Sequence, residues 1–308
     1  MRAFIFPGQG SQAVGMGAAL AGASRAAADV FAEVDEALGQ NLFRLMRDGP
    51  DDELKLTENA QPAIMAHSIA VLRTWGVRLS DIATFVAGHS LGEYSALCAA
   101  GSFDLATTAK LLKLRGQAMQ RAVPVGQGAM AALLGADLEL ARKIADAAAQ
   151  GDVCAVANDN DPSQVVISGH KAAIDRAIDM AKEMGAKRAV SLPVSAPFHC
   201  PLMQPAAEAM RDALSYVVLE PPAVPVYANV TAQPETDPDT IRNQLVEQVT
   251  GMVRWRESVT NMFNAGVDEF VELGGKVLGT MVKRIAADAK VTSVVTIEDI
   301  EALAKEIA

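Results

Sequence analysis

The segment VAGHSLGEYSAL, residues 86–97, places a serine in a pattern typical of a nucleophile. A short apolar run ends at Gly88, and Ser90 follows in the order Gly-His-Ser-Leu-Gly. Between a strand and a helix, G-x-S-x-G forms a nucleophile elbow, whose glycines allow the sharp turn that exposes the hydroxyl. The first N–H groups of the helix, including that of Leu91, would then face an oxyanion formed beside Ser90. The alternative is a serine that only caps the helix, with glycines that serve packing.

A serine nucleophile needs a base, and the chain has four histidines. His67 lies in a helical pattern and is expected to be packed, and His170 lies at a strand–helix turn. His89 adjoins Ser90 in the chain, so its side chain should diverge from the hydroxyl. By elimination the base is His199, in the proline-bracketed loop SAPFHCPLM. The alternative is an exposed loop histidine, and no Asp or Glu stands out as a third member.

A second glycine-rich turn, FPGQGSQ, follows the first apolar run of the chain. Gly8, Gly10 and Ala13 imitate a dinucleotide-binding fingerprint, which also requires a second strand ending in an acidic residue about 20 positions on. Residues 24–38 have a helical pattern instead, so nucleotide binding is not expected. The turn would more usefully bring the backbone N–H of Gln9 to the oxyanion, where one donor is typically worth about 10²–10³ in rate.

Arg115 lies beside the apolar stripe of an amphipathic segment, LLKLRGQAMQRAV. If its side chain points inward, it needs an anion, and the fork of a guanidinium suits a carboxylate held by two hydrogen bonds. The alternative is an ordinary surface arginine, and on these residues alone that alternative is favoured.

Short apolar runs alternate with longer helical patterns, which is typical of an α/β fold. A helix is expected directly after Ser90. The other expected elements are strands at 3–6, 84–88, 224–230, 268–273 and 291–296, with helices at 17–38, 60–76, 104–122 and 202–215. Residues 231–240 are expected to be a turn-rich loop.

The pattern changes to β-α-β-β-α-β between Gly128 and about residue 195, with the last strand expected over 188–195. This order is that of a ferredoxin-like unit. We therefore expect a large α/β domain, residues 1–125 and 196–308, with a small ferredoxin-like domain, residues 126–195, inserted in it.

Composition limits the possible functions. The net charge of −10 argues against nonspecific nucleic-acid binding. No apolar stretch approaches the roughly 20 residues that span a bilayer, and the N-terminal apolar run is too short for a signal peptide, so a cytoplasmic location is expected. The three cysteines lack metal-like or paired spacing and are expected to be inert thiols in a reducing compartment.

Together these segments resemble the malonyl-CoA:acyl carrier protein transacylases of type II fatty acid synthesis, and more loosely the acyltransferase domains of polyketide and animal fatty acid synthases. FPGQGSQ and GHSLGEYSAL are specific in combination, and RGQAMQ, VPVGQGAMAALLG, SQVVISGHKAAID, LPVSAPFHCPLM and LVEQVTGMVRW follow in the family's order. The resemblance covers nearly the whole chain and implies an α/β-hydrolase-like core with a ferredoxin-like insert.

The resemblance also implies roles for particular residues. Ser90 would carry the malonyl group as an ester, and His199 would be its base. The main-chain carbonyl of Gln248 would orient that histidine in place of an Asp. Arg115 would bind the free carboxylate of malonate, and the N–H groups of Gln9 and Leu91 would form the oxyanion hole.

Met130 and Phe198 would line the acyl pocket, and Phe198 occupies a position tied to acyl-group choice in related synthase domains. The family usually has GPGKVLTGL near the C-terminus, whereas this chain has ELGGKVLGTM at 272–281. The part that matches the family's segment, GGKVLGTM, is one residue shorter.

The implied partners are malonyl-CoA and acyl carrier protein, with neither nucleic acid nor membrane, and the family is commonly monomeric. No metal and no cofactor is expected, because coenzyme A and phosphopantetheine enter only as parts of the substrates. Carrier proteins of this pathway are acidic, so docking would need a basic patch. The candidates are Lys182, Lys187, Arg188, Lys276, Lys283 and Arg284.

Three alternatives remain. The first is a serine thioesterase or esterase, which would give Arg115 no role. The second is a polyketide-pathway acyltransferase with a different acyl group. The third is a non-enzymatic subunit that docks carrier proteins.

Overall fold

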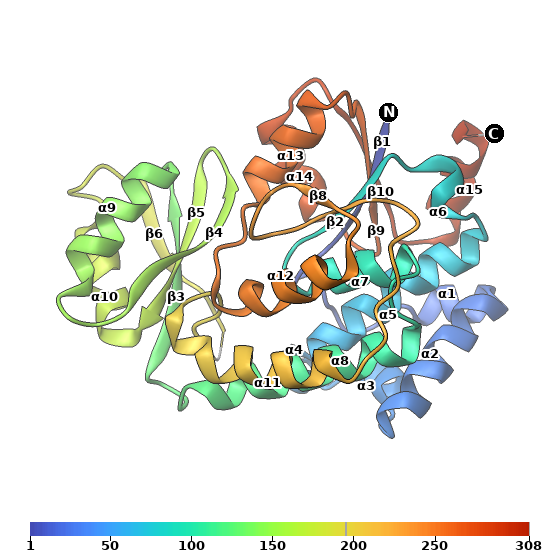
Figure 1. The fold of residues 1–308 in the computed structure, drawn as a ribbon, viewed down its shortest axis with the longest axis horizontal. Coiled ribbons are helices and arrows are strands. Elements are labelled where there is room, and N and C mark those ends of the chain that lie inside the picture. The colour runs from blue at the N-terminus through green and yellow to red at the C-terminus, as the bar shows by residue number, and fades with distance from the viewer. Residues whose placement is uncertain (195, 308) are drawn as a thin grey trace.

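The computed structural model describes residues 1–194 and 196–307, and within them the strands form two separate sheets (Figure 1). The larger sheet has the order β10-β9-β1-β2-β7-β8, and all its neighbours are parallel except β7 and β8. Its strands are β1 (Arg2–Phe6), β2 (Phe85–Gly88), β7 (Val226–Tyr227), β8 (Pro234–Glu235), β9 (Glu269–Leu273) and β10 (Lys290–Val294). Phe6 pairs with Gly88, so the turns that follow β1 and β2 leave the sheet side by side.

Helices cover both faces of this sheet because β1 is apolar on both faces. Phe4 and Phe6 belong to one core with residues of the helices at 25–38, 57–75 and 105–122, whereas Ala3 and Ile5 pack with residues of the helices at 255–264 and 278–285. The helices outside the smaller sheet are α1 (Ala18–Ala23), α2 (Arg25–Leu38), α3 (Leu42–Asp48), α4 (Asp51–Lys55), α5 (Thr57–Trp75), α6 (Leu79–Ile82), α7 (Leu91–Ala99), α8 (Leu105–Ala122), the 3₁₀ turn η1 (Pro201–Met203), α11 (Gln204–Ser215), α12 (Pro238–Thr250), α13 (Trp255–Asn264), α14 (Leu278–Ile285) and α15 (Ile297–Ile307).

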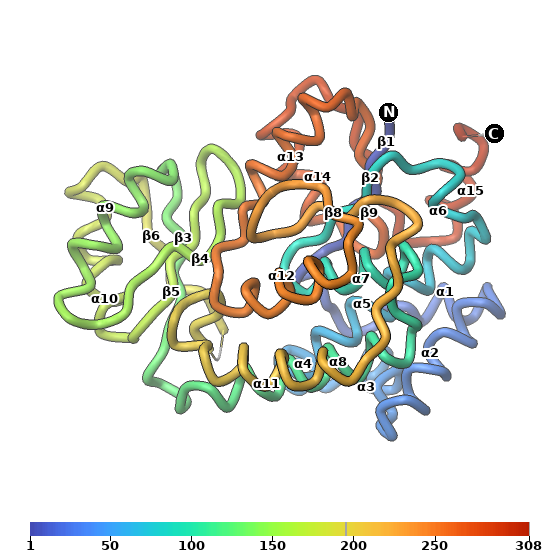
Figure 2. Tube along the Cα trace, in the orientation of Figure 1, coloured from blue at the N-terminus to red at the C-terminus, as the bar shows by residue number. Residues whose placement is uncertain are grey.

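The smaller sheet lies to one side of the molecule, and the chain enters it after α8 and returns towards η1 (Figure 2). It is antiparallel, with the order β4-β5-β3-β6. Its elements follow the predicted order: β3 (Gly128–Leu134), α9 (Leu138–Ala149), β4 (Cys154–Asp161), β5 (Gln164–His170), α10 (Lys171–Ala181) and β6 (Arg188–Ser191). The α/β class is thus confirmed, whereas the two-domain division and the hydrolase-like and ferredoxin-like descriptions stay predictions.

Several predicted elements are shorter than expected, among them the strand expected over 224–230, which is only Val226–Tyr227. In two others local chemistry ends the element. The helix expected over 17–38 is two helices that meet at Ser24, whose hydroxyl accepts the N–H of Ala27 at 3.3 Å and so starts α2. The strand expected over 188–195 ends at Ser191. Pro193 follows two residues later and has no N–H for a ladder. Ser195 lies outside the described residues.

The segment expected to be only a loop, residues 231–240, contains more structure than predicted. It includes β8 and the start of α12 at Pro238. Asp237 accepts the N–H of Thr240 at 2.8 Å and caps this helix, and a proline in the first turn is well tolerated.

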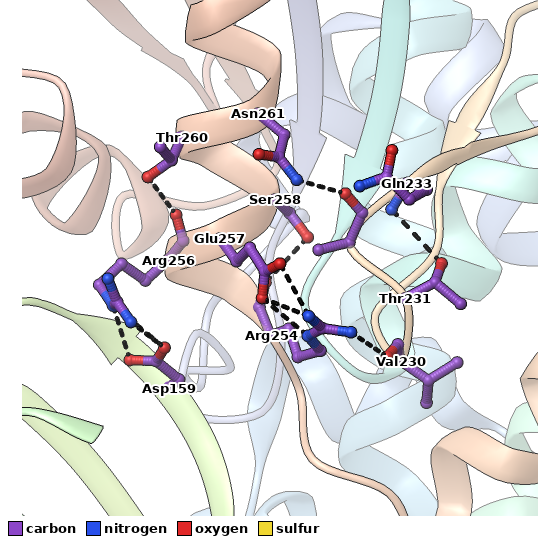
Figure 3. Close-up of polar contacts among 11 residues, drawn as sticks. Asp159, Val230, Thr231, Gln233, Arg254, Arg256, Glu257, Ser258, Thr260 and Asn261 are labelled. Carbon is purple, nitrogen blue, oxygen red and sulfur yellow. Dashed lines mark hydrogen bonds and ion pairs between the residues drawn. The ribbon is translucent and has the colours of Figure 1, made fainter. Parts of the chain in front are cut away.

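The carboxyl end of β4 holds the smaller sheet against α13 and α14. Asp159 is 2% exposed and pairs with Arg256 of α13 (Figure 3), and Asp161 is fully buried and pairs with Arg284 of α14. The backbone N–H of Asp159 also donates to the carbonyl of Val253 at 2.9 Å. These two ion pairs and the backbone hydrogen bond join β4 to α13 and α14, and breaking either pair would leave a buried carboxylate without its cation.

Candidate active site

Ser90 occupies a strained turn between β2 and α7. Its φ is +54°, in a region that non-glycine residues rarely adopt. A Cβ on Gly88 would lie 1.9 Å from the backbone of Gly92, and a Cβ on Gly92 would lie 2.3 Å from the carbonyl oxygen of Phe6. Both glycines of the motif are therefore required by close backbone contacts, and the turn has the form of a nucleophile elbow.

His199 lies beside the serine, as expected, although 109 residues separate them in the chain. The Ser90 hydroxyl oxygen is 2.8 Å from His199 Nε2, and His199 Nδ1 is 2.8 Å from the carbonyl oxygen of Gln248. A carbonyl can only accept, so Nδ1 carries the proton and Nε2 is free to accept from the serine. His199 is 4% exposed, which contradicts the alternative of an exposed loop histidine.

The imidazole of His199 is neutral at ordinary pH. Burial, followed by the positive charge of Arg115, lowers the pKa of His199 to about 3. The hydrogen bond to Gln248 opposes this shift. A neutral imidazole with a free Nε2 lone pair can take the Ser90 proton over the whole physiological pH range.

Arg115, on α8, is 1% exposed, so the surface alternative is wrong. Its Nη1 donates to Gln61 at 2.7 Å, and its Nη2 donates to Ser90 Oγ at 3.0 Å and to the side chain of Gln248 at 2.8 Å. Its Nε is buried without a hydrogen-bond partner in the described part of the chain. Burial lowers the pKa of Arg115, but a guanidinium remains protonated in proteins, so a charged group lies against the serine.

A cleft of about 400 Å³ opens above these side chains. Met130 and Phe198 line it and are 4% and 8% exposed, as expected of pocket residues. Gln9 and Leu91 also line it, and neither backbone N–H donates to an acceptor within residues 1–194 and 196–307. The cleft therefore joins a serine, a base, a cation and two free N–H groups, which suits acyl transfer.

Three polar residues around the serine were not found from the sequence: Gln61, Glu93 and Asn229. Gln61 holds Arg115, and Asn229 accepts the N–H of Ser90 at 2.7 Å while donating to the carbonyl of Gly88, also at 2.7 Å. Glu93 accepts from the side chain of Gln248. In the sequence each of these three is simply a polar residue among apolar neighbours. That pattern does not show which groups the side chain contacts.

The other histidines lie where the sequence predicted. His67 is buried in α5, and His170 lies at the junction of β5 and α10. His89 directs its Nε2 to Asn160 at 2.8 Å rather than to the serine.

The three cysteines are free, and burial raises the pKa of Cys98 and Cys154 to about 11, so both thiols are protonated and unreactive. Across the described residues, His, Cys, Asp and Glu form no group of three that could hold a metal ion. No helix in that part of the chain combines the length and apolar character needed to cross a bilayer.

The shortened segment near the C-terminus connects β9 to α14. Glu272 accepts the N–H groups of Val277, Leu278 and Gly279 at 2.8–3.1 Å, so its carboxylate caps α14. A Cβ on Gly275 would lie 2.8 Å from Pro7, so this loop packs closely against the FPGQG turn.

A family model described as the acyl transferase domain matches residues 3–297. The chain belongs to this family. The resemblance drawn from the motifs is thus confirmed, and the members of the family are acyltransferases.

Curated relatives and solved structures agree closely with the chain. It is 45% identical over 284 residues to the malonyl CoA-acyl carrier protein transacylase of Escherichia coli K12, covering 92% of each chain. The same enzyme of Bacillus subtilis is 44% identical, with 97% of this chain and 95% of that chain covered. The crystal structure of the acyl-carrier-protein S-malonyltransferase from Bartonella henselae superposes with a TM-score of 0.97 at 51% identity, over 99% of both chains. A malonyl-transacylase in complex with its type II PKS acyl-carrier protein gives 0.96 at 40% identity, again over 99% of both chains.

Proposed function

We propose that the chain transfers the malonyl group of malonyl-CoA to the phosphopantetheine thiol of an acyl carrier protein. The observation that carries this proposal is the contact of Ser90 Oγ with both the His199 Nε2 and the Arg115 guanidinium, at 2.8 and 3.0 Å. A hydrolase requires only the first contact. A cation beside the nucleophile suits an acyl group that has its own carboxylate.

The reaction proceeds in two halves through an ester on Ser90. The hydroxyl attacks the thioester carbonyl while His199 takes its proton, and the N–H groups of Gln9 and Leu91 stabilise the oxyanion. Collapse of the tetrahedral intermediate breaks the carbon–sulfur bond, and His199 returns the proton to the departing coenzyme A sulfur. The carrier-protein thiol then takes the acyl group by the reverse steps. The Gln248 carbonyl holds His199 in the tautomer that this exchange needs.

Arg115 binds the malonyl carboxylate and Met130 and Phe198 shape the pocket around the acyl carbons. A thioester is activated enough to react without a metal or other cofactor. We assign this activity to fatty acid synthesis in the cytoplasm. The proposed enzyme is a monomer, and its residues 126–195 form the inserted domain. A polyketide carrier protein is the alternative partner, since one similar structure contains such a complex.

Intact-mass measurement tests the proposal. Mixing the enzyme with malonyl-CoA should add the mass of one malonyl group, and adding carrier protein that bears phosphopantetheine should remove it and add it to the carrier. Acetyl-CoA and methylmalonyl-CoA in parallel measure the selectivity. Release of free malonate without carrier would instead indicate a thioesterase, and a complete lack of adduct would indicate a non-enzymatic docking subunit.

Only three of the six candidate basic residues lie together, so the proposed carrier-protein patch is smaller than the sequence suggested. Lys187, Arg188 and Arg284 line one shallow groove of about 450 Å³, whereas Lys182, Lys276 and Lys283 are exposed and do not line it. The groove lies beside β6 and α14, where an acidic carrier protein would find Lys187 and Arg188 next to the Arg284–Asp161 pair.

Reversing the charge of Lys187 and Arg188 together should raise the KM for carrier protein about tenfold and leave the KM for malonyl-CoA unchanged, because rim charges steer association. Arg284 is unsuitable for this test because it pairs with the buried Asp161. Arg142→Glu with Lys143→Glu, an exposed adjacent pair on α9, is the matched control. If both double substitutions raise the KM for carrier protein equally, the cause is the change in net charge and the groove is not the docking patch.

A further inference from the structure

Arg115 is a buried cation with which no carboxylate of the described residues forms a direct pair. Within residues 1–194 and 196–307 its hydrogen bonds go to two amide oxygens and one hydroxyl, those of Gln61, Gln248 and Ser90. An uncompensated charge at 1% exposure is costly, so a counter-charge is expected nearby.

Glu93 meets this requirement through one intervening side chain. It is 2% exposed and lies on the first turn of α7, three residues after the serine. Gln248 Nε2 donates to Glu93 Oε2 at 2.7 Å, and Gln248 Oε1 accepts from Arg115 at 2.8 Å. The amide dipole of Gln248 is therefore aligned between a cation and an anion. The N–H of Asn229 donates to the same carboxylate oxygen at 3.1 Å.

A bound malonyl carboxylate would change this balance. One guanidinium would then face two buried carboxylates, and the excess negative charge is most easily removed by adding a proton to one of them. The substrate carboxylate gains direct hydrogen bonds from Arg115, whereas Glu93 is one amide away. Protonated Glu93 still accepts from Gln248, so the hydrogen bonds that hold the site persist.

We propose that Glu93 is a positioning residue whose ionised form balances the charge of Arg115 in the free enzyme, and that this ionised form takes up a proton from solvent when an acyl carboxylate binds Arg115. This inference rests on the proposed function, because it requires an acyl group with a free carboxylate. Arg115 keeps its proton throughout, and no bond other than that between oxygen and hydrogen forms on Glu93.

Among the described residues, the ionisable groups that interact with Glu93 are Arg115, on α8, and Tyr94, on its own helix. His199, on the loop before η1, interacts with Arg115. Burial raises the pKa of Glu93 to about 7, against the opposing effects of Gln248, Asn229 and Arg115. Burial also raises the pKa of Tyr94, which therefore stays protonated. His199 is the competing proton acceptor among these groups, because a carboxylate bound to Arg115 would offset the positive charge that is one cause of the low pKa of His199.

Calorimetry on the Ser90→Ala protein, which binds without reacting, measures the linked proton. Titration with malonyl-CoA in buffers of different ionisation enthalpy should show uptake of about half a proton per site at pH 7 and more at pH 8. Acetyl-CoA has the same phosphates and should show none. Adding Glu93→Gln should abolish the uptake, whereas Glu58→Gln, at a partly exposed acid, should not.

A second measurement uses the intact nucleophile. Since binding takes up a proton, the KM for malonyl-CoA should rise with pH above 7, by up to about tenfold per unit, while the KM for acetyl-CoA should not. Malonyl-CoA binding without proton uptake would overturn the inference, and so would uptake that survives in Glu93→Gln, which would assign the proton to His199. Failure of malonyl-CoA to bind at all would contradict the proposed function instead.

Discussion

Replacing Ser90 with alanine is expected to abolish the acyl-enzyme and to lower kcat/KM for malonyl transfer by at least about 10⁴-fold. The hydroxyl is the only group in the described cleft that His199 Nε2 contacts by a hydrogen bond, at 2.8 Å. Without it the base has no nucleophile to activate. Intact mass after mixing with malonyl-CoA and single-turnover transfer to carrier protein measure the two losses.

The exposed Ser80, close to β2 in the chain, provides a control, because its hydroxyl donates to the neighbouring Asp81 and lies outside the cleft of Ser90. Ser80→Ala should leave both readouts unchanged. His199→Ala should lose nearly as much as Ser90→Ala, and the double variant should be little worse, because the two groups act as one unit. An adduct that forms in Ser90→Ala would place the nucleophile elsewhere.

Replacing Arg115 with alanine is expected to lower kcat/KM for malonyl transfer by about 10²–10³-fold while acetyl transfer changes by less than about tenfold or rises. The malonyl carboxylate would lose its charged hydrogen bonds, whereas an acetyl group has no carboxylate to lose. The variant also removes one cause of the low pKa of His199, so that pKa should rise towards its ordinary value. Parallel transfer assays with the two CoA esters measure the split.

The exposed Lys110, also on α8, is the matched control, and Lys110→Ala should affect neither substrate. Arg115 also donates to Ser90 and Gln248, so its loss has a structural component common to both acyl groups. Only the difference between the substrates therefore reports on the carboxylate. Equal losses for malonyl and acetyl would contradict the role of Arg115 in binding it.

The position of β4 links these predictions to the architecture. Asp159 and Asp161 anchor the strand on α13 and α14, and between them Asn160 contacts the ring of His89, the residue before the nucleophile. Met130, on β3 of the smaller sheet, thus lines the cleft of Ser90 from a part of the chain that buried ion pairs hold against α13 and α14. A shift of β4 would change the acyl pocket without any change in the residues that line it.

The sequence alone predicted the features that depend on local pattern. G-x-S-x-G after an apolar run predicts a turn that projects the Ser90 hydroxyl away from the strand, since so sharp a turn needs glycine at positions 88 and 92. Elimination among four histidines was enough to select His199. The alternation of short apolar runs with helical patterns predicted the α/β class, because buried parallel strands and their covering helices each have a characteristic period.

Only the tertiary structure decided which long-range partners surround the serine. The residue pattern by itself favoured a surface position for Arg115, and only the family resemblance reversed this. An arginine beside an apolar stripe has the same pattern whether its guanidinium is solvated or enclosed. Its enclosure depends on Gln61 and Gln248, which lie on two other helices, 54 and 133 residues away in the chain. The same holds for Glu93, since the charge of a buried carboxylate depends on neighbours that only folding brings together.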